Sequence, residues 1–342
     1  MSMSAASLPL TSLVPPPRAL SFPYFKSFHF PIRTPNHKFS KRLVANADFS
    51  SSAPTSSTVE EEQEEEEESY QVLSAMKSDY NDIVIVDTPK SRMLLLDSTH
   101  NVHSILYKEQ KWTGSYWDEF ASLPAIVPKG PIAILGLGGG TAAHLMLHLW
   151  PSLQLEGWEI DEIVIYAFCN SIFDKFILID KARDYFGLSD LEKTTEGGGI
   201  LNVHIGDVFI PSENLRRRYA GIVVDLFSEG KVLPQLEEVS TWLELQERLM
   251  PDGRFMVNCG GIDGESSPES LLSDETWLLN PTLKALSKAF PGQLSWKRMP
   301  KVSGENFMAL TGSMPDVESW SASVSSPLSS NVKDWRPCGQ VS

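Results

Sequence analysis

The sequence PIAILGLGGGTAAHL, at residues 131–145, decides the fold. Its first part, PIAILG, is a short apolar run of the kind that forms a buried strand. Four glycines come at the end of this run: Gly136, Gly138, Gly139 and Gly140. An apolar helical pattern then continues to Trp150, where Pro151 ends it. A strand, a glycine loop and a helix in this order predict the first βα unit of a Rossmann-like domain, in which backbone amides can approach a ligand.

The chain beyond this unit keeps alternating between strand and helix patterns. Further strands are predicted at residues 153–160, 201–205, 221–225 and 254–259, and helical stretches separate several of them, notably 236–250. A helix near 281–290 and strands at 293–298 and 306–311 extend the pattern. Such alternation predicts an α/β fold with a doubly wound, mostly parallel sheet.

Three acidic residues are predicted at the carboxyl ends of these strands, the edge at which open α/β sheets bind ligands. Glu159 lies 23 residues after Gly136 and is placed to accept hydrogen bonds from both ribose hydroxyls of a nucleotide. Asp207 is placed to bind an adenine amino group, and Asp225 to meet the reactive end of the ligand. The structural alternatives are a tight turn with a surface Glu and, for each Asp, a helix N-cap.

The N-terminal part of the chain has the composition of a targeting segment. Residues 1–47 contain six basic residues and no acidic ones among many Ser and Pro, which predicts a plastid transit peptide; a disordered basic terminus is the alternative. Residues 48–69 form an acidic linker that is expected to be disordered, with eight Glu between 60 and 68. We therefore expect a chloroplast stromal protein.

Composition excludes several classes of function. The formal net charge is −15, which argues against nucleic acid or an anionic membrane as a partner. No apolar run reaches the ~18 residues of a membrane span. The three cysteines, Cys169, Cys259 and Cys338, lack the spacing of a zinc site, so we expect no metal.

The folded part of the chain divides into two expected domains and a tail. Residues 70–125 are predicted to form a small β domain, with a β-hairpin made by 82–88 and 92–98. Residues 126–312 are predicted to form the Rossmann-like domain, and the Ser- and Pro-rich residues 313–342 a disordered tail.

Several motifs in a fixed order give the chain a family resemblance. The hairpin is followed by WTGSYWDEF at 112–120, GLGGGTAAHL at 136–145, WEIDEIVI at 158–165, HIGDVF at 204–209 and VVDLFSEG at 223–230. In this order and spacing they resemble the spermidine synthase family over residues 70–311. The resemblance implies a class I methyltransferase-like fold, and S-adenosylmethionine or its decarboxylated form as cofactor. It also implies a small-molecule amine or other nucleophile as acceptor, and it is compatible with a homo-oligomer.

The resemblance assigns roles to individual positions. It implies that Gly136, Gly138, Gly139, Gly140, Glu159 and Asp207 hold the cofactor, that Asp225 is the catalytic carboxylate, and that Tyr116, Glu119 and Glu229 are the candidates for the substrate site. Gly139 stands where the family has an Asp, and Asp225 is followed by Leu226, Phe227 and Ser228 instead of the family's second acidic residue. Three activities are therefore open: aminopropyl transfer to a polyamine, methyl transfer to an unknown acceptor, and a non-catalytic role that keeps the fold.

Residues 166–179, YAFCNSIFDKFILI, interrupt an otherwise amphipathic helix with an almost wholly apolar stretch. Without these residues WEIDEIVI runs directly into DKARDYFGL. We interpret the stretch as an insertion from a retained intron or a misplaced exon boundary; the alternative is an unusually long helix buried on all sides.

Overall fold

The structure is a computed structural model that describes residues 69–78, 80–99, 101–161, 178–210, 218–262, 276–300 and 306–339. All of these residues belong to the unit Ala45–Ser342. The expected targeting segment, almost all of the acidic linker and residues 166–177 of the expected insertion lie outside the described residues. Among the helices that are described, none combines the length and the apolar character that a membrane crossing requires.

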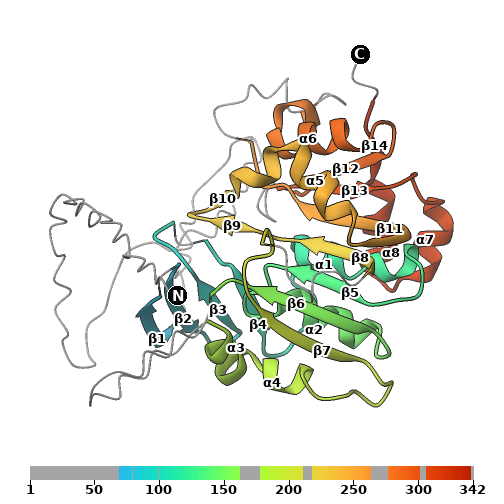
Figure 1. Cartoon of the computed structure of the whole chain (residues 1–342). Helices are drawn as coiled ribbons and strands as arrows, with labels where there is room; N and C mark the ends of the chain where they lie inside the picture. The colour runs from blue at the N-terminus through green and yellow to red at the C-terminus, as the bar shows by residue number, and fades with distance from the viewer. Residues whose placement is uncertain are drawn as a thin grey trace, which may run out of the picture. The chain divides into compact units, whose positions relative to one another are not determined.

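An eight-stranded sheet forms the centre of the molecule (Figure 1). The strand order is β14-β12-β13-β11-β8-β5-β6-β7. The five strands from β11 to β7 pair in parallel, whereas β13 runs antiparallel between β11 and β12. The strands are β5 (Ile132–Leu135), β6 (Gln154–Glu159), β7 (Ile200–Ile205), β8 (Tyr219–Val224), β11 (Leu249–Asn258), β12 (Leu294–Arg298), β13 (Phe307–Thr311) and β14 (Arg336–Pro337). The predicted doubly wound, mostly parallel sheet is confirmed.

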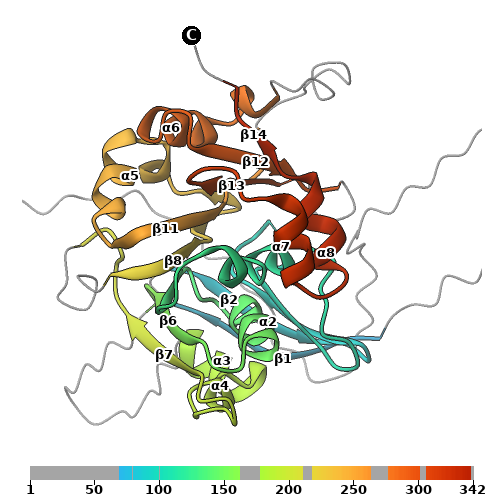
Figure 2. The same ribbon diagram turned by 90° about the vertical axis from the view of Figure 1, so that its right-hand side faces the viewer.

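Helices cover both faces of this sheet, and the alternation of side chains along β5 shows why. Ile132 and Ile134 belong to the core on one face, and Ala133 and Leu135 to the core on the other. Because successive side chains of a strand point to opposite faces, a strand buried on both faces is apolar throughout. The helices are α1 (Tyr116–Phe120), α2 (Thr141–Leu149), α3 (Leu178–Phe186) and α4 (Leu188–Leu191), then α5 (Val239–Gln246), α6 (Pro281–Ala289), α7 (Val317–Ser323) and α8 (Leu328–Asn331), with short 3-10 turns at Leu123–Ile126, Pro234–Glu237, Thr276–Leu279 and Val332–Asp334. Helices α1 and α2 pack on the first core, and α5 and α6 on the second (Figure 2).

A separate antiparallel sheet precedes the main one. It contains β1 (Gln71–Lys77), β2 (Asp82–Asp87), β3 (Ser91–Leu95) and β4 (Ser104–Tyr107), in that order. The predicted hairpin is β2 and β3, and a strand on each side extends it to four.

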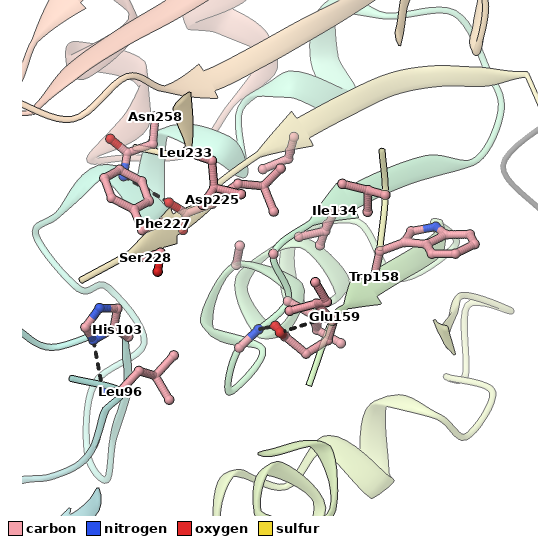
Figure 3. A pocket seen from close by; sticks show the side chains of 18 of the residues that line it. Leu96, His103, Ile134, Trp158, Glu159, Asp225, Phe227, Ser228, Leu233 and Asn258 are labelled. Carbon is pink, nitrogen blue, oxygen red and sulfur yellow. Dashed lines mark hydrogen bonds between the residues drawn. The ribbon is translucent and has the colours of Figure 1, made fainter. Parts of the chain in front are cut away.

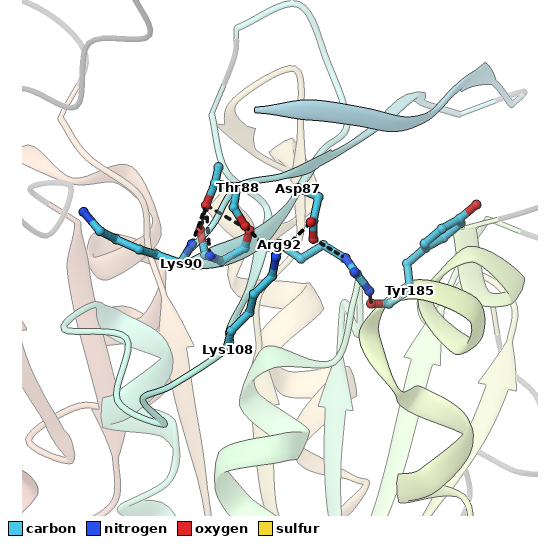
Figure 4. A network of polar contacts seen from close by, with 7 residues as sticks. Asp87, Thr88, Lys90, Arg92, Lys108 and Tyr185 are labelled. Atoms are coloured by element: carbon cyan, nitrogen blue, oxygen red, sulfur yellow. Dashed lines mark hydrogen bonds and ion pairs between the residues drawn. The ribbon is translucent and has the colours of Figure 1, made fainter. Parts of the chain in front are cut away.

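A polar network joins this small sheet to the main domain (Figure 4). Asp87 forms ion pairs with Arg92 at 2.9 Å and Lys108 at 2.8 Å. Lys108, followed by Arg92, lowers the pKa of the Asp87 carboxyl against the opposing effect of desolvation. Arg92 also donates to the backbone carbonyl of Tyr185 in α3. The network thus connects β2, β3 and the end of β4 to a helix of the main domain.

The C-terminal residues do not form the disordered tail that their Ser and Pro content predicted. Helices α7 and α8 lie side by side (Figure 2), and β14 pairs with β12 at the edge of the main sheet. Trp320 and Trp335 expose 1% and 3% of their surface, and the indole of Trp320 donates to the carbonyl of Ser122. A few large apolar side chains pack this segment onto the domain, so its polar composition wrongly predicted disorder.

Deletion of residues 166–179 is a direct test of the expected insertion. Leu178 and Ile179, the last two residues of that range, are the first residues of α3 and are each 1% exposed. The deletion would place Val164 and Ile165 in their positions, so the apolar pair of α3 would be kept. We expect the shortened chain to fold with a Tm within a few degrees of that of the full chain, as measured by circular dichroism.

A matched variant shows whether these two positions matter. Leu178→Ser with Ile179→Ser in the full chain removes the same apolar pair, and losing a large buried side chain costs about 2–5 kcal/mol per site. A shortened chain that is unfolded, or as unstable as this double variant, would refute the insertion, and so would the presence of residues 166–179 in the mature transcript.

Candidate functional site

The register of the parallel strands places four residues of the site in one row. Val224 of β8 pairs with Leu135 of β5 on one side and with Val257 of β11 on the other, and Leu135 also pairs with Trp158 of β6. The residues that follow these partners along the carboxyl edge are Asn258, Asp225, Gly136 and Glu159. The order of strands reverses between β5 and β8, and this switch point is where open α/β sheets bind ligands.

A pocket of about 610 Å³ opens at this edge (Figure 3). Its wall combines the strand ends of the main sheet with α1, the β9–β10 hairpin (Phe227–Ser228 and Lys231–Val232) and the segments that connect the strands of the small N-terminal sheet. The lining includes Leu96 and His103 from the segment between β3 and β4, and Tyr116 from α1. The volume lies within the roughly 300–1,000 Å³ of small-molecule sites.

Five of the predicted cofactor and catalytic residues, Gly136, Gly138, Glu159, Asp207 and Asp225, line this pocket, and so does Tyr116. Gly139 and Gly140 do not. A Cβ atom at Gly139 would lie 2.8 Å from Cβ of Ser104, and one at Gly140 would lie 2.7 Å from Cδ1 of Leu188. These two glycines allow β4 and α4 to pack closely against the loop.

All five backbone amides of the glycine loop already have hydrogen-bond acceptors. Gly136 and Leu137 donate to the carbonyl of Trp158, and Gly140 donates to that of Leu137. Gly138 donates to the Glu159 carboxylate at 3.0 Å, and Gly139 donates to Oγ of Ser104 at 2.8 Å. The loop therefore offers no free amide to an anion, unlike a phosphate-binding loop.

Glu159 connects this loop to the end of β6. It accepts from Gly138 through one carboxylate oxygen and from Ile160 and Asp161 through the other. Burial raises the pKa of the Glu159 carboxyl, and these three backbone donors oppose the rise. Because each carboxylate oxygen has two lone pairs, Oε2 can accept one further hydrogen bond from a ligand, whereas Oε1 is already bonded twice.

The other two acidic residues differ in their environments. Asp207 accepts from the backbone amide of Phe209 at 2.8 Å, so it stabilises its own turn as well as lining the pocket. Burial raises the pKa of Asp225 to about 7, although hydrogen bonds from Asn258, Tyr116 and Trp117 lower it. A carboxyl group that ionises near neutral pH is suited to general-base catalysis.

The structure places Glu119 and Glu229 outside the wall of this pocket. Glu119 lies on α1 but turns away from the pocket, is fully buried, and binds Nζ of Lys297 at 2.8 Å. Burial raises the pKa of Glu119, and Lys297 opposes this effect. Glu229 occupies the turn between β9 and β10 with a positive φ of 51°, between Ser228 and Gly230, which do line the pocket.

Sequence reasoning missed two residues that shape the site. Asn258 ends an apolar strand just as Asp225 follows one, so the pattern of a polar residue after an apolar run was a usable signal. Ser104 carried no such signal, because its role depends on the packing of β4 against the glycine loop.

The charge of the described pocket lining comes from acidic residues. Glu159, Asp207 and Asp225 are its acidic residues, and no Lys or Arg occurs among the lining residues that the structure describes. An acidic pocket with neutral amides and aromatic rings favours a cationic or hydroxyl-rich ligand over an anionic one.

The topology defines an α/β domain with a doubly wound, mostly parallel sheet, and the pocket at its carboxyl edge has the place and size of a small-molecule site. No family model matches the chain. Over 201 residues, 58% of the chain, the sequence is 26% identical to a probable polyamine aminopropyl transferase of Bifidobacterium longum, and the match spans 40% of the length of that curated relative. The chain is thus distantly similar to this polyamine aminopropyl transferase over less than half of that protein's length.

Two solved structures show how the fold compares. A spermidine synthase in complex with the transition state analogue AdoDATO has a TM-score of 0.49 and 17% identity, covering 70% of this chain and 73% of that one. Human methyltransferase-like protein 13 in complex with SAH has a TM-score of 0.43 and 19% identity, covering 66% and 95%.

The buried pair of Glu119 and Lys297 generates a prediction about stability. Lys297→Met leaves the Glu119 carboxyl buried without its partner, and breaking a buried pair in this way costs about 3–5 kcal/mol. The double variant Glu119→Leu with Lys297→Met removes both charges and should recover most of that loss. The measurement is the free energy of unfolding in urea.

Lys333→Met is the matched control, because its partner Glu318 is 79% exposed and an exposed ion pair contributes about 0–1 kcal/mol. If Lys297→Met destabilises the protein no more than Lys333→Met, the buried pair does not hold α1 in place.

Proposed function

We propose that the chain binds an S-adenosyl sulfonium nucleoside in this pocket and transfers a group from it to a small amine. The observation that carries the proposal is the combination of three carboxylates with a glycine loop whose amides are all bonded. Dinucleotides and nucleoside triphosphates need amides or cations for their phosphates. A sulfonium nucleoside has a positive charge and ribose hydroxyls, which match carboxylate acceptors.

Each predicted residue has a role in this proposal. Glu159 accepts a hydrogen bond from a ribose hydroxyl through Oε2, and Asp207 accepts a hydrogen bond from the adenine amino group. Gly136 and Gly138 let the nucleoside approach the strand ends. At Gly136 any side chain is excluded, because φ is +88° and a Cβ would lie 2.1 Å from the backbone oxygen of Asp225.

We propose aminopropyl transfer as the reaction, in line with the distant relationship to polyamine aminopropyl transferases. The bound sulfonium supplies a good leaving group: a C–N bond forms to the propyl carbon, the C–S bond breaks, and its electron pair neutralises the sulfur. Asp225 accepts the proton that the amine loses. Tyr116 and Trp117 hold the Asp225 carboxylate by hydrogen bonds and exclude water from it.

The same geometry favours the decarboxylated cofactor over S-adenosylmethionine. The carboxylate of an intact methionine tail would require a cation or a free amide near the glycine loop. The described lining contains no Lys or Arg, and the loop amides are engaged. A tail without a carboxylate avoids this cost.

Titration calorimetry with purified protein tests the proposal. We expect decarboxylated S-adenosylmethionine to bind at least about tenfold more tightly than S-adenosylmethionine, since one unpaired charge costs about 1.4 kcal/mol or more. ATP and NAD should not bind. Glu159→Gln should weaken nucleoside binding about tenfold, because it loses one charged acceptor.

Glu156→Gln is the matched control on the same strand, because Glu156 lies outside the pocket and binds His204. A preference for S-adenosylmethionine would instead support methyl transfer, and binding of neither nucleoside would support a non-catalytic role.

We also propose that residues 1–47 direct the chain to the chloroplast stroma, on the basis of their basic, Ser- and Pro-rich composition. A fusion of these residues to a fluorescent protein should enter plastids. Diffuse fluorescence outside plastids would contradict the proposal.

A further inference from the structure

Asn258 is the last residue of β11, one position beyond Val257, which pairs with Val224 of β8. Asp225 is likewise one position beyond Val224, so the two strands deliver the two side chains side by side. Nδ2 of Asn258 donates to Oδ1 of Asp225 at 2.9 Å (Figure 3). Asn258 is 1% exposed, so it has no freedom to turn toward solvent.

The orientation of the Asn258 amide is determined by a second hydrogen bond. Its Oδ1 accepts from the backbone amide of Gly260 at 3.1 Å. Gly260 has a φ of +66°, and a Cβ there would lie 2.8 Å from Cγ2 of Val232. The turn after β11 therefore keeps the acceptor end of the amide facing Gly260, and only the donor end can face Asp225.

The other two donors to Asp225 come from a different part of the fold. Tyr116 and Trp117 belong to α1, a helix of five residues outside the sheet. Asn258 belongs to the strand that neighbours Asp225 directly. A donor carried by the adjacent strand holds its acceptor more rigidly than one carried by a short helix, because paired strands move together.

We propose that Asn258 is a positioning residue that holds the Asp225 carboxylate in one orientation toward the acceptor amine. The inference rests on the proposed function and deepens it. With Oδ1 held by the amide, rotation of the carboxylate is restricted, and the lone pair that the three donors leave unused can accept the proton. The hydrogen bond also favours the ionised form of Asp225, which is the form that accepts a proton.

The titratable groups around Asp225 determine how a pH experiment must be interpreted. Those that line the described pocket are Tyr80 from the segment between β1 and β2, Tyr116 from α1, His103 from the segment before β4, Glu159 from β6 and Asp207 after β7. Burial and the nearby Asp225 keep the pKa of Tyr116 well above its ordinary value, and burial lowers the pKa of His103. Because burial also raises the pKa of Glu159, a midpoint near neutral pH is assigned to Asp225 only where Asp225→Asn abolishes it.

The test uses the full chain with Asn258→Leu, which removes the donor at similar volume, and Asn258→Asp, which keeps the shape and replaces the donor with an acceptor. Carbon-detected NMR of the Asp side chains follows the Asp225 midpoint in the ligand-free protein, with Asp225→Asn to assign its signal. Calorimetry follows nucleoside binding, and the pH profile follows formation of methylthioadenosine. Asn202→Leu, on β7 and outside the pocket, controls for the loss of an amide.

We expect the Asp225 midpoint to rise in both variants, and further in Asn258→Asp because two adjacent carboxylates resist ionisation. Turnover near pH 6.5 should fall about tenfold for each pH unit of rise and recover at high pH, with nucleoside affinity unchanged. An unchanged midpoint and pH profile in both variants would overturn the role of Asn258. A raised midpoint in a protein without turnover would support the role of Asn258 and refute the proposed reaction. If Asn258→Leu does not fold, Asn258→Asp decides alone.

Discussion

The parallel pairing of β8 with β5 and β11 is the constraint on which the site depends. Val224 is paired on both sides, so Asp225, Gly136 and Asn258 emerge from the sheet at the same level. A slip of one residue in any of these strands would turn its side chains to the opposite face. Because β5 is apolar on both faces, a polar face does not fix its register. The fit of its side chains to two different cores does. The geometry of the site is therefore a property of sheet packing rather than of its loops.

The glycine loop shows how a common sequence pattern can have an uncommon role. A strand, a glycine loop and a helix usually present free amides to a phosphate. Here Ser104 and Glu159 accept from two of those amides, and backbone carbonyls accept from the other three. Ser104 belongs to the small N-terminal sheet, so that sheet completes the loop, and the segments between its strands form one wall of the pocket. Residues of both domains thus accept hydrogen bonds from the loop amides and determine the electrostatic character of the site.

The sequence was sufficient for the fold and for the acidic residues at the carboxyl edge of the sheet, because both follow from local patterns. Apolar runs that end in Gly136 and Asp225, and a strand pattern that ends in Glu159, indicate the edge at which the strand ends meet. It was insufficient for Glu119, since the partner Lys297 lies 178 residues away and no local pattern predicts that pairing. It was also insufficient for the C-terminal segment, where Trp320 is buried among residues of polar composition. The structure of both depends on contacts between residues far apart in the sequence.

Helix α1 connects the Glu119 ion pair with the C-terminal segment. Its residues Tyr116 and Trp117 face Asp225, whereas Glu119 faces Lys297, whose Nζ also donates to the carbonyl of Asn331 in α8. A helix of five residues is too short to be stable alone, so its position must come from tertiary contacts. The buried ion pair and the C-terminal helices supply those contacts on the side away from the pocket. Glu119, which the sequence suggests as a substrate-site residue, therefore contributes to the site indirectly. It holds the helix that carries the two donors to Asp225.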